Sequence, residues 1–229
     1  MSRIVWCSLL LMGMSSSFLG AEWTTEVIQT EDAALRTGTK MDTHFVVESG
    51  GILKVGTNYT IGGTDTEPRA NLTLNVGGEI SIAAGALLRT DQSGIHLQMY
   101  GGTITALLTS ENGGLSLRGN DLVDIYGGTI NVNRMNLAAG GRTSTMNLHD
   151  GQVSIQYFDF GYGGGTGNLN IYGGEMRILQ TGAETSGIAE IAVTNGEMYV
   201  ATLGGAKEFH LHQTGGTVVA GNVNLRGGG

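Results

Sequence analysis

The chain has 229 residues with 40 glycines, one proline and one cysteine, and its 12 basic and 20 acidic side chains give a formal net charge of −8. The acidic balance disfavours nucleic acid and anionic membrane surfaces as partners. A single cysteine excludes a disulfide framework, and glycine without a three-residue period excludes collagen.

Residues 1–21 are typical of a secretory signal peptide. Arg3 precedes an apolar run over 4–14, and small residues follow over 15–21, so we expect cleavage after Gly20 or Ala21. The apolar run is shorter than a comfortable membrane span, although a retained N-terminal anchor is the alternative. We therefore predict a secreted or cell-surface protein, extracellular or associated with the outer membrane, that is not inserted in a membrane after signal removal.

Residues 22–44 lack the glycine pairs of the later chain and contain the apolar side chains of Trp23, Val27, Ile28 and Leu35. We predict that this segment forms an N-terminal cap, as irregular strand or one short helical turn. The reason is that a stack of strands exposes an open core and unpaired edges at its end.

From 45 to 229 the sequence repeats. An alternating apolar run meets a glycine corner, and the second residue of each corner serves as a marker glycine. The markers recur every 20 to 27 residues, at Gly51, Gly78, Gly102, Gly128, Gly151, Gly174, Gly196 and Gly216. A period of this length indicates a repeat architecture.

Apolar residues occupy fixed positions relative to the marker. The second residue after it is Leu53, Ile80, Ile104, Ile130, Val153, Met176, Met198 or Val218, and the fourth is Val55, Ile82, Ala106, Val132, Ile155, Ile178, Val200 or Ala220. This alternation predicts a strand with one buried face. A second alternating run precedes the marker, and a third follows it with Met135, Leu137, Phe158, Phe160, Leu203, Val223 and Leu225.

The run before the marker is shifted by one residue in the first two repeats, where Val47 and Leu74 are the apolar residues. A shift of one residue would turn a strand over, so we expect a different corner or a bulge there.

These patterns predict an all-β fold: a single-stranded parallel β-helix, or β-solenoid, of about eight turns with three short strands per turn. The alternative is an up-and-down barrel or a sandwich, which needs no register between repeats. The repeats run to the last residue, Gly229, without a polar capping segment. We expect the chain to be truncated at its C-terminus.

The repeat resembles the glycine-rich β-helix repeats of large bacterial secreted proteins: autotransporter passenger-like repeats and those of PEP-CTERM-type surface proteins, on a pectin-lyase-like β-solenoid. The segments 124–132 (DIYGGTINV), 147–155 (NLHDGQVSI) and 170–178 (NIYGGEMRI) carry the resemblance, together with 137–141 and 160–165. It implies an extended rod at the cell surface, used for adhesion or display.

Polysaccharide lyases and hydrolases also use that fold, and such hydrolases need paired carboxylates on one face. The nearest candidates are Asp121, Asp124 and Glu111, and we expect Asp121 near a corner and Asp124 pointing outward from mid-strand. We predict no convergence of carboxylates, no catalytic activity and no cofactor. His210 and His212 should face outward from one strand, with Phe209 and Leu211 buried and Glu190 beside His210, but we predict no metal site.

An outward ladder is the strongest candidate for a binding site. Two residues before the marker lie Tyr100, Tyr126, His149 and Tyr172, and two residues earlier lie Gln98, Asp124, Asn147 and Asn170. Ring faces pack on sugars while amides bind hydroxyls, so the strip suits an extracellular polysaccharide. The alternative is that the ladder only stiffens the sheet through cross-strand contacts.

The sequence thus predicts a non-catalytic structural or adhesive β-solenoid, with an extracellular polysaccharide or a host or cell surface as partner. A polysaccharide-binding module that uses the Tyr/His ladder is the first alternative, and a fragment of a polysaccharide lyase or hydrolase is the second.

Overall fold

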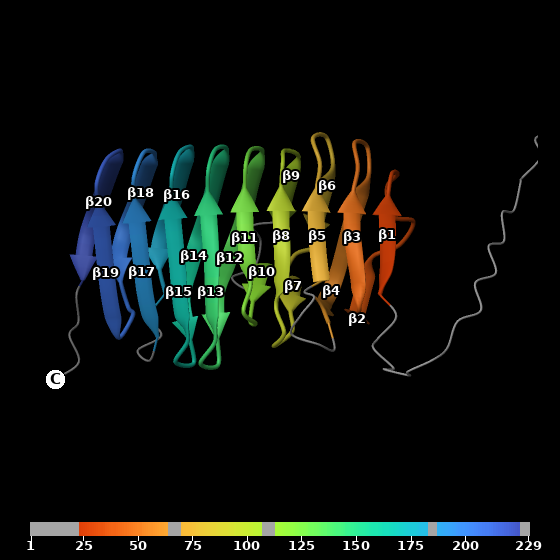
Figure 1. Cartoon of the computed structure of the whole chain (residues 1–229), viewed down its shortest axis with the longest axis horizontal. Coiled ribbons are helices and arrows are strands. Elements are labelled where there is room, and N and C mark those ends of the chain that lie inside the picture. Colours follow the sequence, from red (N-terminus) through yellow and green to blue (C-terminus); the bar gives the residue numbers. More distant parts are fainter. Residues whose placement is uncertain (1–22, 64–69, 107–112, 183–186, 225–229) are drawn as a thin grey trace, which may run out of the picture.

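The computed structural model describes residues 23–63, 70–106, 113–182 and 187–224, and the described chain is all β without a helix. Its turns follow one another in chain order, from β1 at one end of the rod to β19 and β20 at the other (Figure 1). Within the described residues, therefore, nothing offers a long apolar helix that could cross a membrane. The predicted leader, residues 1–21, lies outside the described residues.

Two parallel sheets form the rod. The first has nine strands, and its order is β1 (Thr24–Ile28), β3 (Thr43–Val47), β5 (Ala70–Leu74), β8 (Ile95–Met99), β11 (Leu122–Ile125), β13 (Thr143–Leu148), β15 (Thr166–Ile171), β17 (Ile188–Val193) and β19 (Glu208–Gln213). Each strand pairs with the strand of the next turn, so the sheet runs along the whole described solenoid.

The second sheet has 11 strands. They are β2 (Arg36–Met41), β4 (Ile52–Gly62), β6 (Glu79–Ile82), β7 (Leu87–Thr90), β9 (Thr103–Ala106), β10 (Gly114–Leu117), β12 (Thr129–Ala139), β14 (Gln152–Tyr162), β16 (Glu175–Thr181), β18 (Glu197–Gly204) and β20 (Thr217–Asn224). We number the turns 1 to 8 by their marker glycines, from Gly51 to Gly216. The chain is thus a β-solenoid of about eight turns, as predicted.

The predicted three strands per turn are separate only in turns 2 and 3, where β6 and β7, and then β9 and β10, follow one another. Elsewhere the second and third runs join into one long strand. The pairing of β12 with β14 still omits one residue, between Val132 and Arg134 of β12. The same break recurs between β14 and β16 and in the later pairs, so the corner between the two runs survives as a bend.

The predicted apolar columns are confirmed. Ile130 pairs with Ile104 on one side and with Val153 on the other, and Val153 pairs with Met176. All four side chains are buried in one continuous core. Like residues therefore lie on like residues at strand spacing, and each turn covers the apolar face of its neighbour.

The shifted pattern of the first two repeats is explained by a different corner. Leu74 of β5 pairs with Met99 of β8, so the strands keep their register. The extra residue lies in the corner, where the Gly78 N–H donates to the Asn75 carbonyl at 3.0 Å. Gly77 within that corner has φ +79°, a conformation that favours glycine.

The segment expected to cap the N-terminal end contributes two strands, β1 and β2. Arg36 of β2 lies over this end of the core, with its guanidinium 5.7 Å from the ring centroid of Phe45. It forms ion pairs with Glu26 at 2.6 Å and with Asp32 at 2.7 Å. A paired cation and the strand edges thus cover the buried ring of Phe45.

At the other end of the described rod, the last turn is more exposed than predicted. Phe209 is partly buried against the core, but Leu211 of β19 is 39 % exposed and Val223 of β20 is 57 % exposed. The prediction that Leu211 is buried is therefore wrong, because β19 and β20 each pair with a neighbour on one side only. Leu225 lies outside the described residues.

Candidate functional site

The four ring-bearing residues of the predicted ladder form one stack. Tyr100, Tyr126, His149 and Tyr172 each follow a strand of the first sheet, in turns 3 to 6. Successive ring centroids are 5.3, 4.7 and 5.2 Å apart, with interplanar angles of 10°, 9° and 17°. The backbone sets this spacing, since the N–H of Tyr126 donates to the Met99 carbonyl and that of Tyr172 to the Leu148 carbonyl.

The stacking decides which parts of the rings a ligand can reach. Both faces of Tyr126 and of His149 are covered by neighbouring rings. A sugar cannot enter between rings at strand spacing, so a sugar could pack only on the outer faces of Tyr100 and Tyr172. The three tyrosines are nevertheless 43 to 48 % exposed, so their edges and hydroxyls form a line along the rod.

The neighbouring column is a ladder of hydrogen bonds. Asn170 donates its amide N–H to Asn147 Oδ1 at 2.8 Å, and Asn147 donates to Asp124 Oδ1 at 2.8 Å. Gln98 does not join this chain of bonds, because its Nε2 donates to the Tyr100 hydroxyl at 3.3 Å. The amides therefore mainly link one turn to the next.

Asp124 is the charged centre of this face. Although it lies mid-strand on the outer face, as predicted, it is a buried side chain, because His96, Asn147 and His149 surround it. His96 Nε2 lies 2.7 Å from its carboxylate and His149 Nε2 lies 3.7 Å away. Burial raises the pKa of Asp124, but the hydrogen bonds from Asn147 and His96 and the charges of the histidines outweigh it and hold that pKa below its ordinary value.

His96 is the member of this cluster that the sequence analysis missed. It lies on β8, two residues before Gln98, and its backbone pairs with Leu122 rather than with Asp124. The contact is diagonal across two strands, a distance within reach of a long side chain. A search for residues at the diagonal position would have found it.

The remaining sequence candidates do not converge on one another. Asp121 and Asp124 have different partners, and Glu111 lies outside the described residues. His210 Nδ1 lies 2.7 Å from Glu190 Oε1, which confirms the predicted neighbour. In the described part of the chain no group of three or more His, Cys, Asp or Glu side chains could hold a metal ion.

Asp121 is buried at the corner before β11, where four donors surround its carboxylate. The hydroxyl of Thr90 and the N–H of Gly119 donate to Oδ2 at 3.0 and 2.9 Å, and the N–H of Ile95 donates to Oδ1 at 2.9 Å. Ser144 Oγ lies 3.3 Å from Oδ2. Burial dominates these hydrogen bonds and raises the pKa of Asp121 to about 6.

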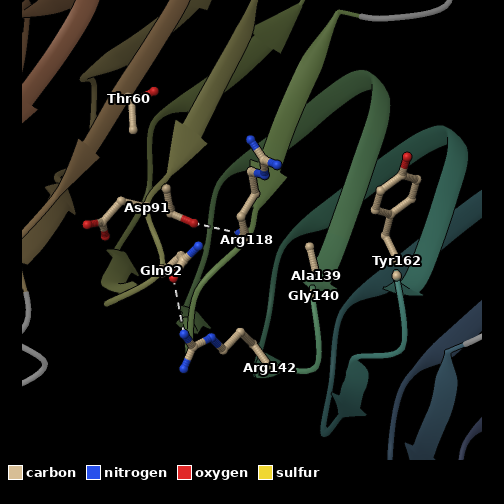
Figure 2. Close-up of a pocket in the computed structure, with 10 residues that line it drawn as sticks. Thr60, Asp91, Gln92, Arg118, Ala139, Gly140, Arg142 and Tyr162 are labelled. Atoms are coloured by element: carbon tan, nitrogen blue, oxygen red, sulfur yellow. Dashed lines mark hydrogen bonds between the residues drawn. The ribbon is translucent and has the colours of Figure 1, made fainter.

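A groove of about 500 Å³ opens beside this corner (Figure 2). It is a second candidate site, and the sequence analysis did not predict it. Residues from turns 1 to 5 line it: Thr60, Thr90, Asp91, Gln92, Arg118, Ala139, Gly140, Arg142, Tyr162 and Gly163.

Unequal corners produce the groove. Leu117 of β10 pairs with Leu137 of β12, and Leu122 of β11 pairs with Thr145 of β13. The chain between these strands is therefore shorter in turn 3, at 118–121, than in turn 4, at 138–144. The corners before β13 and β15 extend beyond the corner before β11 (Figure 1). The short corner of turn 3 thus lies in a recess.

No protein-family model matches the chain, and neither a characterised protein nor a solved structure is significantly similar to it. The stacked parallel turns and their ladders define the class as a β-solenoid, and this class is shown by the structure alone.

Proposed function

We propose that this protein is a secreted or cell-surface β-solenoid that acts as a non-catalytic structural or adhesive rod. The resemblance to autotransporter passenger-like and PEP-CTERM-type repeats supports this proposal. The observation that carries it is that side chains on the outer face of the first sheet contact one another across neighbouring turns. Its rings stack on one another, and its amides and carboxylate bond from turn to turn.

Such contacts favour a rigid rod. Each stacked pair adds about 0.5–1.5 kcal/mol beyond its area burial, and each bond between Asn170, Asn147 and Asp124 adds about 1 kcal/mol. All of them join neighbouring turns, so they oppose the separation of turns under bending or pulling. A stalk or a display scaffold at a cell surface needs this property.

Replacement of Tyr126 and Tyr172 by Ser tests the proposal. If the ladder stiffens the rod, the double variant melts at a lower temperature, while any retention on columns of immobilised polysaccharides is unchanged. If melting is unchanged and retention is lost, the structural proposal fails and the ladder is a binding site.

A polysaccharide-binding module is the second candidate. The line of exposed tyrosine edges favours it. A polysaccharide lyase or hydrolase is less well supported, because Asp121 and Asp124 are held by different partners. A folded sample should release neither reducing sugar nor unsaturated ends from a panel of polyuronides, and clear turnover would refute the non-catalytic proposal.

A further inference from the structure

The groove of Figure 2 concentrates positive charge on an acidic protein. Two of its lining side chains are arginines, Arg118 and Arg142, whereas the whole chain has a net charge of −8. Arg118 is exposed, and in the described part of the chain no carboxylate forms an ion pair with its guanidinium. Its backbone is fixed, because its N–H donates to Thr90 Oγ1 at 2.7 Å.

Arg142 closes the lower end of the groove in this view. Its Nη2 donates to Gln92 Oε1 at 3.2 Å and so bridges turn 4 to turn 2 across the short corner of turn 3 (Figure 2). The Arg142 fork keeps further N–H donors for a ligand. Figure 2 also shows the carboxylate of Asp91 directed away from Arg118, and Ser93 donates to Asp91 Oδ1.

An aromatic ring forms the opposite wall. Tyr162, at the end of β14, is 43 % exposed and projects in the same direction as Arg118 from the other side of the groove (Figure 2). Ala139 and Gly140 lie between them, so no large side chain fills the floor there. The ring of Tyr162 does not belong to the stacked ladder, and among the described residues no other aromatic ring stacks on it.

We propose that this groove binds an acidic sugar unit of a polysaccharide, with the carboxylate on Arg118 and Arg142 and the sugar ring against Tyr162. Guanidinium groups bind carboxylates through paired charge-assisted hydrogen bonds. Aromatic faces pack on the apolar faces of sugars, while Gln92 and Thr60 offer polar partners for hydroxyls. The two arginines can pair with one or two anionic groups. They are too few to neutralise the phosphates of a nucleic acid backbone.

The groove volume of about 500 Å³ lies in the range of small-ligand sites. This proposal does not rest on the structural role of the rod, because the groove lies at the corners of turns 1 to 5 and uses none of the ladder residues. The proposal of binding in the groove and the proposal of stiffening by the ladder can therefore be refuted independently of each other.

Calorimetric titration of the whole chain with tri-galacturonate tests the proposal, with its methyl ester as the uncharged match. We expect saturable binding of the acid that weakens at high salt, because the groove is open to solvent, and about tenfold weaker binding of the ester. Equal binding of acid and ester, or no saturable binding at millimolar acid, would overturn the proposal. A sulfated trisaccharide that binds in place of the uronate would overturn the assignment to a uronate.

Variants locate the site. Arg118→Gln and Arg142→Gln should each weaken binding of tri-galacturonate about tenfold, because each loses a charge-assisted pair. Arg177→Gln is the matched control, since Arg177 lies on β16 outside the groove, and it should bind as the wild type does. If Tyr126→Ser with Tyr172→Ser abolishes binding while Arg118→Gln does not, the acid binds at the ladder and the groove proposal is wrong. The comparison of acid with ester needs no variant and therefore stands even if a substitution impairs folding.

Discussion

The imidazole of His149 stacks on the phenol ring of Tyr126, with centroids 4.7 Å apart and planes inclined by 9°. The residues are 23 positions apart in the sequence, which is one turn of the solenoid. On its other face His149 stacks on Tyr172 at 5.2 Å, and its Nε2 lies 3.7 Å from Asp124. One imidazole therefore links three consecutive turns.

Replacement of His149 by Ala should lower the free energy of unfolding by about 1–3 kcal/mol, because two ring stacks are lost. His149→Tyr keeps a ring at this position and should lose less. Denaturant unfolding measures both. Thr194→Ala, at an exposed position of the same corner column, is the control and should change stability by less than about 0.5 kcal/mol. Equal losses for His149→Ala and His149→Tyr would show that stacking does not stabilise the rod.

Asp121 should make stability fall as the pH rises from 4 to 6. Its pKa is about 6 in the folded chain, against an ordinary value of 3.8. The folded state therefore holds a proton that the unfolded state has released, so the stabilisation is complete below pH 4 and is lost as the pH rises through 6. This difference corresponds to about 3 kcal/mol.

Unfolding of wild type and Asp121→Asn between pH 4 and 7 measures this effect. The variant cannot release the proton, so its stability should vary less across that window. Asp124 acts at lower pH and with the opposite sign, because its lowered pKa gives stability that is lost as the pH falls through that pKa. If the stabilities of wild type and Asp121→Asn changed in parallel with pH, the assignment of this pH dependence to Asp121 would be wrong.

Arg36→Ala should weaken the N-terminal end of the rod. The change removes the ion pairs to Glu26 and Asp32 and the contact with Phe45, and it leaves two partly buried carboxylates without their cation. We expect a loss of about 2–3 kcal/mol in denaturant unfolding. Lys40→Ala, at an exposed position of the same strand, is the control. A loss no larger than that of Lys40→Ala would show that Arg36 does not cap the core.

Alanine substitutions at Gly174 and Gly141 distinguish the cost of backbone strain from the cost of steric crowding. They have nearly equal φ, +70° and +74°. A Cβ on Gly174 would lie 2.6 Å from the Gly151 carbonyl oxygen, whereas one on Gly141 would meet nothing within 4 Å. Gly141→Ala should cost about 1 kcal/mol for its backbone conformation. Gly174→Ala should cost clearly more, because neighbouring turns would have to separate.

Thermal unfolding of both glycine variants measures this difference. Similar melting temperatures for Gly141→Ala and Gly174→Ala would mean that adjacent turns can move apart at the marker corner, against the close approach seen in the structure.

Much of the architecture followed from the sequence. Alternation at fixed distances from the marker glycine predicted which side chains are buried and which are paired, as Ile130 with Val153 shows. It also placed Tyr126 beside His149. The alternation could not predict whether adjacent runs join, as in β12, or separate, as in β6 and β7, because a small corner bends the chain in either case.

The sequence by itself determined the faces and the register, because period-two burial and a repeated corner leave one way to stack like residues on like. Only the tertiary structure decided how closely and how nearly parallel the rings stack, that His96 reaches Asp124 diagonally, and that a groove lies between the corners of turns 2 and 4. These features depend on how far each corner projects and on side chains from separate turns, and a repeat pattern encodes neither.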